Sequence, residues 1–328
     1  MSGRARGAWV RVVFACLPAL AGSGCAHVSS LQVPAAAAQV ELTATPFFAQ
    51  ERYQCGPAAL ATVLVAAGVD TDAAALVPEV YLPGRKGSLA PELLGAVRRR
   101  GLLPYVLAPD PAALVAELDG GRPALVLQNF GSTSRPAWHF AVVIGYERDA
   151  ERFILRSGTT RRQTLAARRF LATWRRADGF AFIVLRPGDL PAADDAGRYL
   201  QAVADLEATG QAGAARLAYE AAVQRWPQQP LAWLGLGNAR FAAQERRGAE
   251  AALRRAVELD AGRVAARNNL ALLLAGRGCR DAALAEIRVA ARDAAGTAMA
   301  AAVEDSAHEI EAAPQRETPT DCPPESGP

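Results

Sequence analysis

The sequence lacks features that several large classes of protein require. Lys86 is the only lysine, so the basic charge is almost entirely arginine. The 36 basic and 33 acidic residues leave a formal net charge of +3, too small to indicate a nucleic acid or an anionic surface as partner. Five cysteines and three histidines in 328 residues are too few for a disulfide scaffold, and no metal-ligand spacing is visible among them.

A phosphate-binding loop is also missing. No GxxxxGK[ST] segment occurs, so a P-loop ATPase is absent from this chain, and we expect no cofactor. What is present is a chain that is 51% hydrophobic and 21% charged, which excludes a wholly disordered protein. Its length leaves room for about two domains with real cores.

The N-terminus has the pattern of a secretion signal. Residues 1–11 contain three arginines and no acid, and residues 12–22 are apolar but too short for a transmembrane helix, which needs about 20 residues. The segment resembles a bacterial lipoprotein signal, in which Cys25 is lipidated and becomes the first mature residue. Gly22 stands where that pattern usually has Leu, so an ordinary cleaved signal is the alternative. Because Ala26 and not Asp follows, the resemblance implies a lipid anchor on the periplasmic face of the outer membrane.

Composition divides the chain into five segments. Residues 1–24 are the signal, and residues 25–42, which lack periodicity, are expected to be a tether. Residues 43–188 mix helical and strand patterns and predict an α+β domain. Residues 189–296 are alanine-rich and lack strand patterns, whereas residues 297–328 carry seven acids against one arginine, which predicts a flexible tail.

Apolar periodicity and turn residues predict the elements of the α+β domain. Helices are expected at residues 56–68, 88–100, 111–119 and 164–174, and strands at residues 102–108, 123–129, 139–146, 152–156 and 180–185. Ser88 is expected to cap the second helix. Asp149 falls in a predicted hairpin turn. Helices that precede a set of strands favour an antiparallel sheet.

A period of 34 residues runs through residues 189–296. The aligned positions are Ala215, Ala249 and Ala283; Ala222, Ala256 and Ala290; and Tyr219, Leu253 and Ile287. Trp233, Leu236 and Gly237 resemble the opening of the tetratricopeptide repeat, and Pro227 resembles its closing proline. The resemblance implies an all-α solenoid of three repeats that binds a protein partner. A generic alanine-rich helical bundle is the alternative.

Cys55 is the strongest candidate for a reactive side chain. It stands at a predicted helix start, where the helix dipole stabilises a thiolate, so we expect its pKa to be lowered. Gly56 keeps bulk away from the thiol, and free N–H groups of the first turn can hold an oxyanion. A base is also needed, and His139 is the only histidine within the predicted folded domain, since His27 lies in the tether and His308 in the tail.

Two segments carry a specific resemblance. QCGPAAL, residues 54–60, and WHFAVVIGY, residues 138–146, together resemble the bacteriocin-processing, double-glycine-leader cysteine peptidases, a papain-like group. The resemblance covers about residues 43–188 and implies a papain-like cysteine peptidase fold. It also implies Cys55 as the nucleophile and His139 as the general base.

Two positions depart from the pattern of that family. Its oxyanion glutamine normally sits one residue further upstream than Gln50, while Gln54 adjoins the cysteine, so the oxyanion role stays open between them. The third member of its triad is usually an aspartate on the strand after the histidine, and Ser157 stands there in this chain. The serine leaves three possibilities, which are weaker turnover, substitution by a carboxylate such as Asp149, or peptide binding without cleavage.

Two functions are therefore predicted. The first is a thiol peptidase of peptide or protein substrates, with acyl transfer by the same residues as a variant, anchored by lipid and assisted by a partner-binding repeat domain. The second is a weak or inactive peptide-binding adaptor that works through its repeats. Double-glycine specificity is not expected, because the chain has no transport machinery. Cys279 and Cys322 either pair in an oxidising periplasm or are unrelated.

Overall fold

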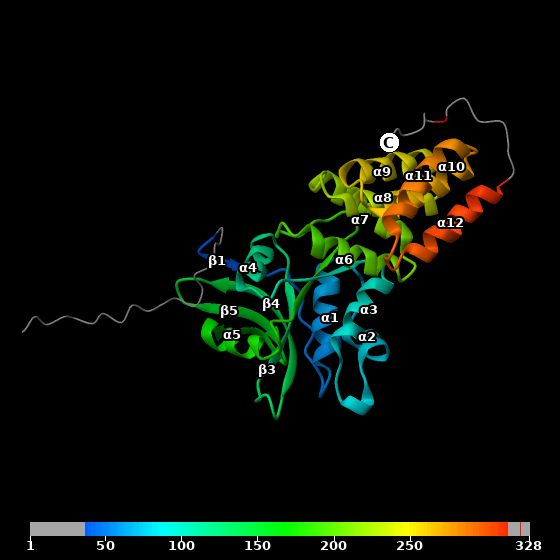
Figure 1. The fold of residues 1–328 in the computed structure, drawn as a ribbon. Helices are drawn as coiled ribbons and strands as arrows, with labels where there is room; N and C mark the ends of the chain where they lie inside the picture. Colours follow the sequence, from blue (N-terminus) through cyan, green and yellow to red (C-terminus); the bar gives the residue numbers. More distant parts are fainter. Residues whose placement is uncertain (1–36, 314–321, 323–328) are drawn as a thin grey trace, which may run out of the picture.

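The computed structural model describes residues 37–313 and Cys322 (Figure 1). The predicted signal, residues 1–24, and the predicted lipid attachment at Cys25 lie outside the described residues. Within them, no helix is long and apolar enough to cross a membrane.

An antiparallel sheet forms the first half of the described chain. Its order is β2-β7-β3-β4-β5-β6, with β1 beside the second half of β4. The strands are β1 (Gln39–Glu41), β2 (Leu103–Val106), β3 (Ala124–Asn129), β4 (Trp138–Glu147), β5 (Arg152–Ser157), β6 (Thr160–Ala166) and β7 (Ala181–Leu185). All five predicted strands are present, so the α+β class is confirmed for this part of the chain.

Helices cover both faces of the sheet (Figure 1). One face carries α1 (Cys55–Ala66), α2 (Ala73–Val80) and α3 (Ala90–Arg99), and the other carries α4 (Pro111–Asp119) and α5 (Ala167–Arg175). Side chains of a strand alternate between faces, so β4 supplies both apolar cores. Val142 and Ile144 pack under α1, whereas Ala141 and Val143 pack on the opposite side.

The end of the expected tether, residues 25–42, is part of the sheet. Residues 39–41 pair with residues 145–147 as β1, and the Leu42 N–H donates to the Ile144 carbonyl at 2.8 Å. A Cβ on Gly145 would overlap the Val40 carbonyl, so glycine is what lets β1 approach. A three-residue edge strand is held by backbone pairing and has no apolar period, which is why the sequence pattern missed it.

The second half of the described chain is a stack of antiparallel helix pairs. The pairs are α6 (Ala196–Glu207) with α7 (Ala212–Arg225), α8 (Pro230–Ala242) with α9 (Arg246–Leu259), and α10 (Val264–Gly276) with α11 (Arg280–Ala294), followed by α12 (Ala300–Ala312). The alanines aligned by the 34-residue period are fully buried, which confirms that the period marks helix contacts. Gly237 also lets two helices approach closely, since a Cβ there would lie 2.7 Å from Leu253 Cγ.

The expectation of a flexible tail from residue 297 is wrong over α12. Val303 and Ile310 are buried against the last repeat, and Arg280 donates to the carbonyls of Ile310 and Glu311, each at 3.0 Å. A disulfide also joins Cys279 to Cys322. The acidic residues of this helix lie on its exposed side, so an amphipathic stripe outweighs the net charge that suggested disorder.

The predicted boundary at residue 189 marks where the strands end and the helix pairs begin. The apolar core of the sheet nevertheless continues across it into the first helix pair. Tyr199 and Val203 of α6 are fully buried in the same apolar core as Leu103 and Tyr105 of β2. An ion pair of 2.6 Å from Arg98 to Asp205 also crosses the boundary. The repeats therefore extend from the sheet as a fixed arm (Figure 1).

Candidate active site

Cys55 is the first residue of α1, the helix buried most deeply against the sheet. Nine consecutive residues of this helix, 56–64, are buried, so the helix is a rigid support. Gln54 precedes it without a side-chain cap, which leaves the backbone N–H groups of the first turn available. The thiol itself is half-buried and opens onto the surface.

His139 reaches the same place from the sheet. It is the second residue of β4, paired with Gln128 of β3. Phe140, the next residue, lines the same cavity as Cys55, which places the start of α1 beside β4. Cys55 and His139 line one cavity of about 610 Å³ together with Gln50 and Ser88. The structure thus brings together the two residues that the sequence singled out.

Ser157 stands beside the histidine as the third member of the set. It is the last residue of β5, next to the turn of the β5–β6 hairpin, and its Oγ lies 2.9 Å from His139 Nε2. When Nε2 is engaged in this way, Nδ1 is the ring nitrogen left for the cysteine. A hydroxyl at this position orients the ring but adds no negative charge.

Asp149 does not replace the missing carboxylate. It lies in the turn after β4, whereas His139 lies at the opposite end of that strand. Eight residue-to-residue steps along the extended strand lead from His139 to the end of β4 at Glu147, a span of roughly 25 Å. The possibility that Asp149 substitutes for the aspartate of the triad is therefore wrong.

Burial controls the protonation of both groups. Desolvation raises the pKa of the Cys55 thiol above its ordinary value, and this outweighs the hydrogen bonds from the backbone of Phe140, Gly56 and Cys55 itself. Desolvation also lowers the pKa of His139. The expectation of a lowered cysteine pKa is wrong, because the apolar surroundings outweigh the helix start. The resting pair is a neutral thiol beside a neutral imidazole.

The two candidate oxyanion glutamines differ in position. Gln50 lines the large cavity and also a small one on the other side of Cys55, and its backbone N–H donates to the Gly158 carbonyl at 3.1 Å. Gln54 lines neither cavity and occupies the position before α1. Of the two, only Gln50 is placed beside the thiol.

Ser88 has a different position from the one predicted. Leu89, not Ser88, precedes the first residue of α3, and no side chain caps that helix. The Ser88 Oγ is instead buried beside Gly56 without a hydrogen-bond partner among the described residues. A buried hydroxyl without a partner is costly.

We predict that Gly56→Ala disrupts this site and that Ser88→Gly rescues it. A Cβ on Gly56 would lie 2.5 Å from Ser88 Cβ and would overlap its Oγ. Overpacking of this kind costs about 1–3 kcal/mol, which urea denaturation would measure. The double variant lacks the clashing atoms and should recover wild-type stability. Unchanged stability of Gly56→Ala alone would contradict the packing described.

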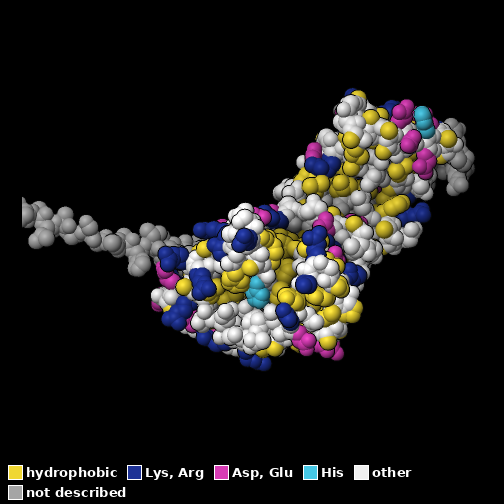
Figure 2. Space-filling view, turned by 90° about the horizontal axis from the view of Figure 1, so that it is seen from below, with side chains coloured by type: hydrophobic (Ala, Val, Ile, Leu, Met, Phe, Trp, Pro, Cys, Tyr) yellow, Lys and Arg dark blue, Asp and Glu magenta, His cyan; other side chains and the backbone are white. Residues whose placement is uncertain are grey.

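Four large apolar side chains that the sequence did not single out surround the site. They are Tyr53, Leu89, Phe130 and Trp138, and each is 39–55% exposed. Three of them line the large cavity, and the ring of Phe130 lies 5.7 Å from that of His139. No other large hydrophobic side chain of the sheet domain, as far as it is described, is exposed. Figure 2 looks onto a hollow of this domain, where apolar and basic side chains surround a histidine.

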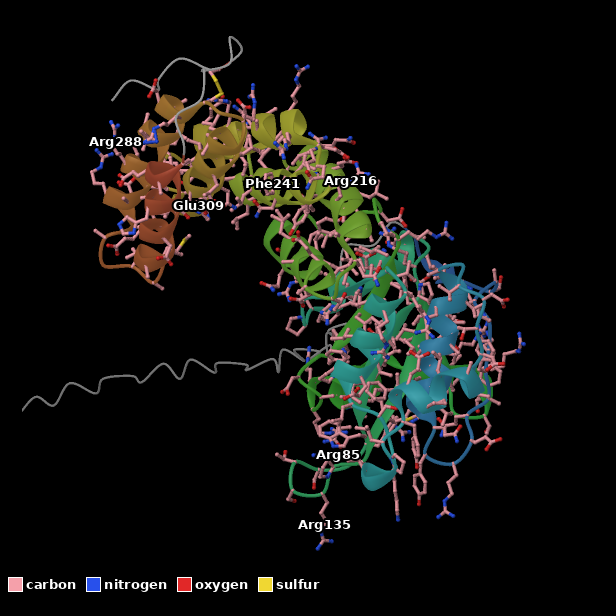
Figure 3. All side chains as sticks on the ribbon, turned by 90° about the vertical axis from the view of Figure 1, so that its right-hand side faces the viewer. Arg85, Arg135, Arg216, Phe241, Arg288 and Glu309 are labelled. Carbon is pink, nitrogen blue, oxygen red and sulfur yellow. A yellow bond between two sulfur atoms is a disulfide. The ribbon has the colours of Figure 1, made fainter. Side chains whose placement is uncertain are left out.

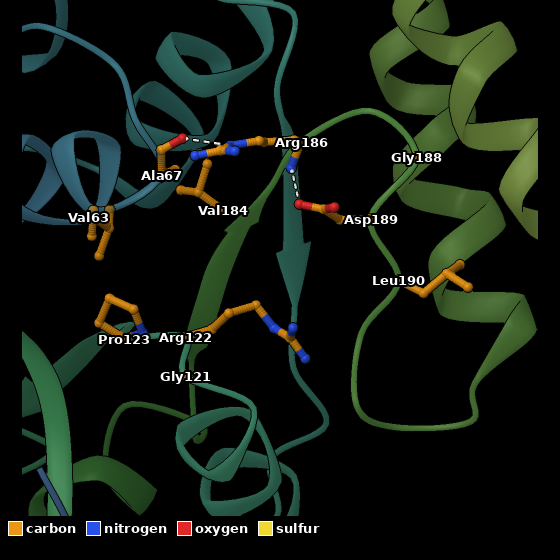
Figure 4. A pocket seen from close by; sticks show the side chains of 11 residues that line it. Val63, Ala67, Gly121, Arg122, Pro123, Val184, Arg186, Gly188, Asp189 and Leu190 are labelled. Carbon is orange, nitrogen blue, oxygen red and sulfur yellow. Dashed lines mark hydrogen bonds between the residues drawn. The ribbon is translucent and has the colours of Figure 1, made fainter. Parts of the chain in front are cut away.

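Other cavities lack this chemistry. One of about 420 Å³ lies at the far end of α1, where Arg186 donates to the Ala67 carbonyl at 2.9 Å (Figure 4). No cysteine or histidine lines it, and it lies between the sheet and the segment that leads to the first repeat. Another of about 250 Å³ lies on the repeats beside Phe241 (Figure 3). Within the described part of the chain, no group of residues could hold a metal ion.

Comparison with known proteins gives structural neighbours only. No protein-family model and no curated protein matches the sequence. A C39-like peptidase from Bacillus anthracis has a TM-score of 0.37 and 16% identity, over 45% of this chain and 98% of that one. The peptidase domain of Streptococcus ComA, a bifunctional ABC transporter in a quorum-sensing pathway, has a TM-score of 0.36 and 18% identity, over 43% and 98%. The TPR2B domain of yeast Sti1 has a TM-score of 0.34 and 17% identity, over 35% and 95%.

Proposed function

We propose that this protein is a cysteine peptidase with Cys55 as nucleophile and His139 as general base. The observation that carries the proposal is the shared cavity of these two residues, together with the Ser157 hydroxyl 2.9 Å from His139 Nε2. A free cysteine at a helix start, a histidine and an orienting hydroxyl form the set that thiol catalysis requires. The exposed aromatic side chains around the cavity suit a peptide substrate.

The chemistry begins from the neutral pair. As Cys55 Sγ attacks the scissile carbonyl, its proton passes to His139 Nδ1, and the negative charge moves to the carbonyl oxygen. The backbone N–H at the start of α1 and the side chain of Gln50 stabilise that oxygen. The imidazolium then donates its proton to the departing amine, which leaves a thioester on Cys55. Water hydrolyses the thioester, and an amine in place of water would give acyl transfer.

The location and the repeat domain complete the proposal. Cys25 is the lipid attachment point, and the protein resides on the periplasmic face of the outer membrane, where an oxidising environment permits the Cys279–Cys322 disulfide. Release of a Cys25→Ser variant from the membrane fraction would be the expected result. The repeats recruit a protein partner, for which exposed Phe241 beside Asn238 and Asn269 is a suitable surface.

The test is hydrolysis of a degenerate peptide library before and after treatment with iodoacetamide. Cys55 is the only free cysteine among the described residues, so alkylation acts on the proposed nucleophile. We expect cleavage products in mass spectra of the untreated sample and none after alkylation. Cleavage that survives complete alkylation of Cys55 would refute the proposal.

A second candidate function is a peptide-binding adaptor that does not cleave. The observation in its favour is the neutral Ser157 in place of a carboxylate, since burial already disfavours the imidazolium form of His139. In that case Cys55→Ala would leave the biological function intact, and library peptides would bind without being cut.

A further inference from the structure

The walls of the candidate site carry positive charge and no negative charge. Arg85 and Lys86 line the large cavity that contains Cys55, and Arg156 lines the small cavity on its other side. Neither cavity is lined by an aspartate or a glutamate. A substrate that enters the large cavity therefore meets Arg85 and Lys86.

These cations are unpaired. Among the described residues, no carboxylate oxygen lies within 4.0 Å of a basic group on Arg85, Lys86 or Arg156. Arginines elsewhere in the same domain are neutralised, as in the pair of Arg100 with Glu79 at 2.6 Å. Arg85 and Arg135 extend from the same end of the sheet domain (Figure 3). As far as the chain is described, the large cavity thus has basic charge that no carboxylate of its own walls balances.

Arg156 is the most unusual of these cations because it is buried. It is 6% exposed, and its guanidinium donates only to backbone carbonyls, those of Thr43, Thr45 and Arg161. Carbonyl groups satisfy its hydrogen bonds but leave its charge without a counterion. The small cavity beside it, of about 10 Å³, is too small for a carboxylate group, so Arg85 and Lys86 are the cations that a substrate can reach.

Lys86 lies in a hydrogen-bonded turn at the edge of the large cavity. A 3₁₀ turn, η1 (Pro83–Arg85), ends at Lys86 in the left-handed conformation (φ 48°), and the Leu82 N–H donates to the Gly87 carbonyl at 2.8 Å. Lys86 Nζ lies 6.0 Å from the centre of the Tyr53 ring. The only lysine of the chain is therefore placed at the entrance to the cavity.

We propose that the cleft selects acidic peptides, in which aspartate or glutamate flanks a bulky apolar residue near the scissile bond. The apolar residue packs against the wall of Trp138 and Leu89, and the carboxylates pair with Lys86 and Arg85. This specificity rests on the proposed peptidase function for its catalytic consequence, but the binding preference can be measured without cleavage.

The test compares two fluorescent peptides that differ only by Glu→Gln substitutions around a central leucine. Binding to the full-length Cys55→Ala protein is measured by fluorescence anisotropy at low and at physiological salt. We expect the acidic peptide to bind about tenfold tighter at low salt, with the preference reduced as salt rises. Lys86→Met should reduce the preference about threefold, and Lys86→Arg should retain it.

A matched control removes one charge elsewhere. Arg288→Gln changes the net charge equally, on an exposed arginine of the repeats (Figure 3), and should leave the preference unchanged. Equal binding of the two peptides, or an equal loss in Arg288→Gln and Lys86→Met, would overturn the inference. Equal competition by an oligonucleotide of the same charge would also overturn it, because it would show a general attraction for polyanions.

Turnover separates this inference from the proposed function. If the wild-type protein cleaves the two peptides at equal rates, the inference fails and the peptidase proposal stands. If the Cys55→Ala protein discriminates between them but the wild-type protein cleaves neither, the inference stands and the peptidase proposal fails.

Discussion

Replacement of His139 by alanine is expected to lower kcat/KM for peptide hydrolysis by about 1,000-fold. General-base catalysis contributes about 10²–10⁴-fold, and the raised pKa of Cys55 means that little thiolate exists without a base to accept its proton. Cys55→Ala should abolish hydrolysis altogether, since no other free thiol is present among the described residues.

The measurement uses initial rates on a peptide that the wild-type protein cleaves. His308→Ala is the matched control, because His308 is exposed on α12, outside the sheet domain, and its loss should leave the rate unchanged. A decrease of less than tenfold in His139→Ala would show that His139 is not the base.

The second expected result concerns the charge at residue 157. Ser157→Ala removes the partner of His139 Nε2 and should lower kcat/KM by about tenfold, the value of one hydrogen bond. Ser157→Asp restores a carboxylate, which stabilises the imidazolium and should raise the pKa of His139. Ser157→Asn supplies a neutral acceptor and separates the hydrogen bond from the charge.

The pH profile distinguishes these variants. His139 must be neutral to accept the thiol proton, and burial lowers its pKa, so the acid limb of wild-type kcat/KM should lie below pH 6.5. The acid limb should move to higher pH in Ser157→Asp and stay in place in Ser157→Asn. Because an imidazolium forms in the transition state, the maximal rate of Ser157→Asp should also increase. Superimposed pH profiles of the wild-type protein, Ser157→Asp and Ser157→Asn would contradict the role assigned to Ser157.

The buried parts of the fold could be predicted from the sequence. The run WHFAVVIGYE becomes β4 because its apolar residues are buried on both faces of the sheet. The 34-residue period fits the helix pairs because its aligned alanines are fully buried between helices. The strand β6 could not be predicted. Its polar residues, TRRQTLA, lie on an exposed edge and are held by backbone pairing with β5, which leaves no hydrophobic signal.

Some features of the candidate site could also be predicted from the sequence, and others could not. Cys55 and His139 could be proposed because few residues of their type occur in the chain, and the structure brings them into one cavity. The direction of the cysteine pKa could not be predicted, because it depends on burial by side chains distant in sequence. The position of Ser88 beside Gly56 also depends on how α3 packs against α1, which no local pattern encodes.

The most direct measurement of the central claim is capture of the acyl-enzyme. A reactive peptide ester is mixed with the protein, the reaction is quenched with acid, and the modified residue is located by mass spectrometry of the digested chain. We expect the acyl group as a thioester on Cys55 in the wild-type protein, and at least 100-fold slower acylation in His139→Ala. Turnover of the ester without acylation of Cys55, or equal acylation in the two proteins, would contradict catalysis by this pair.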